Sequence, residues 1–91
     1  MKKTEEKKLI QAKALLEKAK ENAQSAYDLV EGVKCDQEER FEEKSEGWQE
    51  SDAGIALEES VDTLTEVSGE LDGLVDSLGE QIEAIQEVLS K

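Results

Sequence analysis

Apolar residues recur along the first third of the chain in alternating steps of three and four positions. The pattern starts at Leu9 and stops after Val33, because Gln37 and Arg40 occupy the next two positions in step. Residues spaced in this way lie on one side of an α-helix and form the seam of a coiled coil. The predicted seam residues are Leu9, Ala12, Leu16, Ala19, Ala23, Ala26, Val30 and Val33. The apolar face is widened by Ile10, Leu15, Tyr27 and Leu29.

The predicted first helix spans residues 4–43, with Thr4 as its N-cap. Two endings are open: Gly32 terminates the helix, or the helix continues as a polar extension to about Lys44. The chain contains no proline, and proline is the residue that most strongly stops a helix. Continuation past Gly32 is therefore the favoured prediction.

A second and longer apolar repeat occupies the other half of the chain and predicts a helix over residues 52–90. Residues 44–51 form the predicted turn, in which Gly47 breaks the period and Ser51 or Asp52 caps the following helix. A break of this helix at Ser68-Gly69 is an open alternative. The predicted seam consists of Leu57, Val61, Leu64, Ser68, Leu71, Val75, Leu78, Ile82, Ile85 and Leu89, flanked by Val67, Leu74 and Val88.

Two long helices joined by a short turn are expected to pack as an antiparallel, coiled-coil-like hairpin. The sequence therefore predicts an all-α protein with one domain over residues 1–91. A single hairpin would leave both wide apolar faces partly in water. We therefore expect a homodimer, in which two hairpins form a four-helix bundle.

Charge is distributed unevenly along this hairpin. The formal net charge is −13, which disfavours direct binding to nucleic acid or to anionic membranes and favours a basic protein as the partner. Residues 21–72 hold seventeen carboxylates against Lys34, Arg40 and Lys44. The lysine-rich residues 1–20 are expected to lie beside the end of the second helix and largely neutralise it.

The acidic residues of the second helix follow one another four positions apart, as in Glu58, Asp62, Glu66 and Glu70. Like charges at this spacing repel by about 0.2–0.5 kcal/mol per pair. A row of carboxylates about 6 Å apart could replace a row of phosphates in a basic groove. The alternative is that the acid only keeps the protein soluble. The predicted partner-binding residues are Glu38, Glu39, Glu42, Glu43, Glu46, Glu50, Asp52, Glu58, Glu59, Asp62, Glu66, Glu70 and Asp72.

Trp48 lies in the predicted turn and has two interpretations. It either packs against the end of the hairpin or serves as an exposed aromatic anchor for a partner.

Residues that commonly carry catalysis or bind metal are scarce. The chain has no histidine, and Cys35 is its single cysteine. These counts leave no zinc site, no thiol–imidazole pair and no internal disulfide. We expect no enzymatic activity, no metal and no cofactor, and we expect a cytoplasmic protein that does not enter membranes.

The stretch from Phe41 to Gly54, followed by acidic heptads, resembles small acidic helical proteins carried by phages and mobile elements. The shared features are an aromatic residue, a Ser-Glu step, a Gln-x-Ser step and a glycine before a Glu- and Leu-rich helix. Small acidic phage proteins include inhibitors of host defence nucleases, some of them DNA mimics, and the best-known class is the anti-CRISPR proteins. The resemblance implies an anti-defence role in a bacterial host cell. Secreted WxG hairpins fit less well, because Gln49 follows Trp48 and Glu50 stands where their glycine would be.

Two functional hypotheses follow, and a third, a sponge for a small anionic signalling molecule, is disfavoured by the negative charge unless the lysine-rich end supplies a pocket. The first is a non-enzymatic phage-type inhibitor, whose acidic, DNA-mimic-like surface binds a basic, nucleic-acid-handling host defence protein. The second is a structural or assembly module, whose apolar faces mediate oligomerisation.

Overall fold

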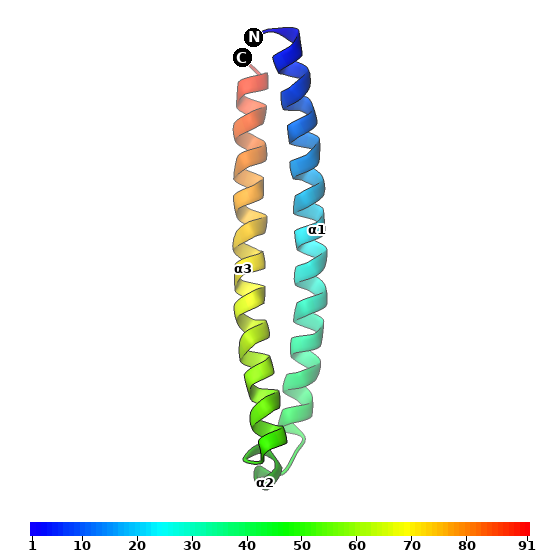
Figure 1. The fold of residues 1–91 in the computed structure, drawn as a ribbon, viewed down its shortest axis with the longest axis vertical. Coiled ribbons are helices and arrows are strands. Elements are labelled where there is room, and N and C mark those ends of the chain that lie inside the picture. The colour runs from blue at the N-terminus through cyan, green and yellow to red at the C-terminus, as the bar shows by residue number, and fades with distance from the viewer.

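The computed structural model describes residues 1–91 and contains three helices and no strand. They are α1 (Lys3–Glu42), α2 (Glu46–Gln49) and α3 (Asp52–Leu89). Helices α1 and α3 lie side by side and run in opposite directions, so the two termini meet at one end and α2 lies at the other (Figure 1). The molecule is an extended rod of 68 × 15 × 14 Å. The predicted all-α class is confirmed.

Both long helices continue through the positions where a break was considered. Helix α1 runs past Gly32, and α3 runs through Ser68-Gly69 without interruption. The predicted N-cap was wrong: α1 begins at Lys3 rather than after Thr4. The carboxylate of Glu5 accepts a hydrogen bond from the Lys2 backbone N–H at 3.1 Å and satisfies that donor at the helix start. Neither long helix has a stretch sufficiently long and apolar to cross a membrane.

The contact between α1 and α3 follows the predicted seam at first and then departs from it. Val33 was expected in the seam but is 49 % exposed, whereas Lys34, Gln37 and Phe41 are half-buried. Ala19, another predicted seam residue of α1, is also exposed. On α3 every predicted seam residue from Leu57 to Leu89 is buried or half-buried, so the strict heptad holds there and the departure is confined to α1. Near Val33 the contact is polar instead, because the half-buried Lys34 pairs with Glu31 at 2.9 Å.

The seam buries little. Only Ala23, Gly54 and Ser68 are buried, and the large apolar residues of the seam are half-exposed. The radius of gyration is 20.1 Å, compared with about 12 Å for a compact domain of this length. The pair of helices therefore exposes much of the apolar surface that a compact domain would cover.

The connection between the long helices is built from local capping interactions. Ser45 caps α2 by accepting a hydrogen bond from the Trp48 N–H at 3.3 Å, and Ser51 caps α3 in the same way from the Gly54 N–H. The Ser51 hydroxyl also donates to the Trp48 carbonyl. Each serine thereby satisfies a backbone group that the helix ends leave unpaired.

The end of α1 is held by a side chain from α2. The Gln49 side-chain amide donates to the carbonyl oxygen of Phe41 at 2.8 Å and to that of Lys44 at 3.2 Å. These bonds satisfy carbonyls that have no partner within α1. The Ser-Glu step, the Gln-x-Ser step and the glycine noted in the sequence are therefore parts of one tight turn.

Candidate acidic binding surface

The thirteen carboxylates predicted to bind a partner lie on the half of the rod nearest α2. We call them the acidic surface. Twelve of them are exposed and Glu38 is half-buried. They come from all three helices and the connections between them: Glu38, Glu39, Glu42, Glu43, Glu46, Glu50, Asp52, Glu58, Glu59, Asp62, Glu66, Glu70 and Asp72.

Positive side chains compensate almost none of this charge. Glu38 is the only member of the acidic surface with an ion pair, at 3.9 Å from the Lys34 ammonium. The other two ion pairs of the molecule, Lys13–Glu17 and Lys34–Glu31, lie within α1. Twelve carboxylates therefore face solvent without a counter-ion from the protein.

Helices α1 and α3 bring acids together at one place near the turn. A shallow depression between them is lined by Glu38 and Glu42 from α1, Glu58 from α3, and the apolar side chains of Phe41 and Val61. Glu58 comes from the other long helix, sixteen residues after Glu42 in the sequence. Their convergence gives the surface two adjacent rows of charge rather than one.

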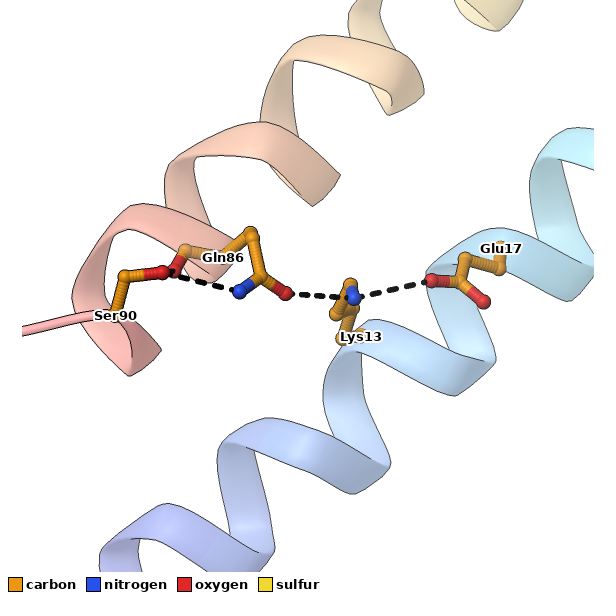
Figure 2. A network of polar contacts seen from close by, with 4 residues as sticks. All are labelled: Lys13, Glu17, Gln86 and Ser90. Atoms are coloured by element: carbon orange, nitrogen blue, oxygen red, sulfur yellow. Dashed lines mark hydrogen bonds and ion pairs between the residues drawn. The ribbon is translucent and has the colours of Figure 1, made fainter.

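At the opposite end of the rod, the lysine-rich start of α1 lies beside the end of α3, as expected (Figure 1). The two segments are not joined by an ion pair. The Lys13 ammonium reaches across to α3, where it donates to the side-chain oxygen of Gln86 at 2.7 Å (Figure 2). It also lies 3.6 Å from Glu17 of its own helix. Gln86 is held in turn by its own bond to Ser90 at 3.1 Å. Lys13 thus meets a neutral partner on α3, and the Lys20 ammonium lies over Gly79, which has no side chain to pair with it.

Trp48 is half-buried in the turn rather than free on the surface. The Lys44 ammonium lies 5.3 Å from the centroid of its ring, within the range of a cation–π interaction. The backbone carbonyl of Trp48 accepts a hydrogen bond from the Ser51 hydroxyl. This packing favours the structural interpretation of Trp48, and the role of aromatic anchor stays a prediction.

A polar layer interrupts the apolar seam near its middle and was not predicted. The Tyr27 hydroxyl donates to Glu31 at 3.1 Å, and the Lys34 ammonium lies 2.9 Å from the same carboxylate. On α3, Ser68 belongs to this layer; it is buried, and its hydroxyl faces the Glu31 carboxylate, whose pKa it helps to lower, without making a hydrogen bond of ordinary geometry. Glu31 follows Tyr27 by four residues and precedes Lys34 by three. This helical spacing is the sequence signal that could have predicted their contact.

The charges in this layer shift one another's pKa values. The bond from Lys34 lowers the pKa of Glu31, although partial burial opposes the shift. The same contact raises the pKa of Lys34. The hydrogen bond to Glu31 and the negative charge of that carboxylate raise the pKa of the Tyr27 hydroxyl. At neutral pH the layer therefore holds a carboxylate and an ammonium in contact.

No three acidic or cysteine side chains are grouped so that they could hold a metal ion. Cys35 is free and exposed. The geometry of this surface is therefore that of an array of separate charges on rigid helices.

Comparison with known proteins adds no relative. No protein-family model matches the chain. Neither the curated proteins nor the solved structures contain a match.

Proposed function

We propose that this protein is a non-enzymatic inhibitor that binds a basic, nucleic-acid-handling protein through its acidic surface. Inhibition follows because the carboxylates occupy the groove that otherwise takes nucleic acid. A host defence protein is the proposed target, in keeping with the resemblance to small acidic phage proteins. The site of action is then the bacterial cytoplasm.

One observation carries the proposal: twelve exposed carboxylates without an ion pair lie on the half of the rod nearest α2, whereas the exposed acids at the end of α3 lie beside the lysine-rich residues 1–20. A surface that served only solubility would be expected to mix both signs of charge. Placing the acid at one end also produces repulsion between neighbours, as between Glu58 and Asp62 or Asp62 and Glu66. Basic side chains of a partner would relieve that repulsion.

The geometry suits a groove made for nucleic acid. Glu58, Asp62 and Glu66 occupy successive turns of α3, so their Cα atoms are spaced by about 6 Å along the helix. The rod is 15 × 14 Å in cross-section, narrow enough to lie lengthwise in a cleft. Because long helices carry the charges, little backbone conformational entropy is lost on binding.

The experiment that tests this proposal is affinity capture from a bacterial lysate at low and high salt, followed by mass spectrometry. We expect a nucleic-acid-binding protein to be captured at low salt and released at high salt, because ion pairs are screened over about 10 Å at 0.1 M salt. An added DNA duplex should displace it. Capture that resists both salt and DNA would contradict the proposal.

A second candidate function rests on a different observation. Large apolar side chains remain exposed along both long helices, among them Leu15, Leu29 and Leu74. We propose that the helix pair is a hairpin that forms a homodimer, with the two copies arranged as a four-helix bundle. If dimerisation is itself the function, the protein is an assembly module, and reversal of the acidic residues would leave its activity intact.

A further inference from the structure

Six exposed apolar side chains lie in a stripe beside the seam, interrupted near the middle of α1 by Asn22 and on α3 by Gln81. They are 36–73 % exposed. We call this stripe the open face, and its members are Leu15, Leu29, Val33, Val67, Leu74 and Val88.

The members of the open face on α1 and α3 lie on the same side of the rod. In an antiparallel helix pair, the residues just before the seam on one helix lie beside the residues just before the seam on the other. Leu15 precedes Leu16 of the seam, and Val67 and Leu74 precede Ser68 and Val75. The side chains that follow the seam meet on the opposite side, as the bond from Lys13 to Gln86 shows.

The extended rod has enough surface to accommodate an interface of standard size. The chain exposes 6750 Å², whereas a compact monomer of this mass exposes about 5,300 Å². The difference of roughly 1,400 Å² exceeds the ~800 Å² that each partner buries in a typical stable interface.

The α1 residues along the edge of this face form a symmetric series at intervals of seven positions. The series is Lys8, Leu15, Asn22, Leu29 and Asp36, with Asn22 at its centre. All five are exposed, and neither Lys8 nor Asp36 takes part in an ion pair. If a second α1 is laid against it in the reverse direction, Asn22 meets Asn22, Leu15 meets Leu29, and Lys8 meets Asp36.

Charge distinguishes the two possible directions of a second copy. If both turns lay at the same end, the two acidic surfaces would adjoin, and Lys8 would lie near Lys8 and Asp36 near Asp36. If the turns lay at opposite ends, the lysine-rich residues 1–20 of each copy would adjoin the acidic half of the other. Opposite charges are favoured across an interface and like charges are not.

We infer that the open face binds a second copy of this chain with its turn at the opposite end, centred near Asn22 of each α1. This deepens the homodimer proposed above by naming its face and direction. It leaves the acidic side chains that point away from the open face accessible. The dimer proposal can fail while the proposed binding of a basic protein holds, because a monomer could still bind that protein through the acidic surface.

Light scattering after size exclusion tests whether the face is covered. We expect a mass twice the 10.1 kDa of one chain and a monomer for Leu29→Glu. Ile10→Glu is the matched control, since Ile10 is 51 % exposed but follows the seam rather than preceding it; it should stay dimeric. Circular dichroism checks that the variants remain helical. A monomeric unmodified chain, or a Leu29→Glu chain that is folded and dimeric, would overturn the inference.

The direction of the second copy is measured on the unmodified chain by attaching a spin label to Cys35, which is exposed. Cys35 is thirteen residues from Asn22, so opposite turns place the two labels about 39 Å apart along the bundle at ~1.5 Å per residue. Turns at the same end place them within the bundle width, about 20–24 Å from two helix diameters. A pulsed dipolar spectrum dominated by the shorter separation would overturn the proposed direction.

Discussion

The backbone carbonyl of Trp48 lies directly against the α-carbon of Gly54. A side-chain carbon at position 54 would collide with the carbonyl oxygens of Trp48 and Gln49 and would come within 2.6 Å of the Gln49 carbonyl carbon. Gly54 is the one glycine of the chain whose missing side chain lets two backbone segments meet. The turn that gathers acid from both helices depends on this contact.

Gly54→Ala should therefore destabilise the protein, although alanine is the better helix former. We expect the collision with backbone to lower the free energy of unfolding by about 1–3 kcal/mol, as in other overpacked sites. Thermal unfolding followed by circular dichroism measures the effect.

Gly73→Ala is the matched control, because it also lies in α3 and nothing approaches it within 4 Å. Here the higher helix propensity of alanine should act alone and stabilise the protein by about 1 kcal/mol. Equal effects of the two substitutions on the free energy of unfolding would show that the close approach of Trp48 to Gly54 does not restrict the residue at position 54.

Ser68→Ala should stabilise the protein. The Ser68 hydroxyl is buried and faces the Glu31 carboxylate without a hydrogen bond of ordinary geometry, and a buried hydroxyl whose bond is not made destabilises a fold by about 1–3 kcal/mol. A midpoint temperature several degrees higher is expected, since 1 kcal/mol shifts it by about 4–8 °C in a domain of this size. A lower midpoint temperature would mean that the hydroxyl has a bonding partner in solution.

Glu31→Gln should destabilise the protein at neutral pH but not in acid. Because Lys34 lowers the folded-state pKa of Glu31, the ionised carboxylate contributes stability above its unfolded pKa of about 4.3. That contribution is lost as the pH falls through the lower, folded-state pKa. The difference in midpoint temperature between the unmodified chain and Glu31→Gln should therefore shrink below about pH 4.

Glu17→Gln is the control for this pH series, since its contact with Lys13 is longer, at 3.6 Å, and Glu17 is exposed. We expect a small effect that varies little with pH. A constant difference for Glu31→Gln from neutral pH to pH 3 would contradict the assigned role of the Lys34 contact.

The apolar periodicity was sufficient to predict the two long helices and their extent. It also placed Leu16, Ala23 and Ser68 in the contact between them. It was wrong at Ala19 and Val33 of α1, which are exposed, although the same heptad holds along the whole of α3. Beside Val33, the half-buried Lys34 pairs with Glu31 at 2.9 Å, and a pattern of apolar residues does not register an ion pair in the contact.

Composition predicted that acid would gather near the turn, but not how the turn is made. Gln49 caps α1 from eight residues beyond Phe41, and no local rule for helix ends includes that bond. The hydrogen bond from Lys13 to neutral Gln86 could not be predicted from the sequence either. Net charges of segments do not show which side chains meet across a particular register.

The central claim is that the acidic surface binds a basic partner, and charge reversal tests it most directly. Glu58, Asp62 and Glu66 would be changed together to lysine, with Glu80, Glu83 and Glu87 changed together as the control at the other end of α3. All six side chains are exposed, and both triple variants change the net charge by the same amount. The measurement is the amount of the salt-sensitive protein recovered from a bacterial lysate by each form.

We expect the variant at Glu58, Asp62 and Glu66 to reduce recovery by about tenfold or more, which corresponds to ~1.4 kcal/mol. The control at Glu80, Glu83 and Glu87 should recover about as much as the unmodified chain. Equal recovery by both triple variants and the unmodified chain would contradict the proposed function.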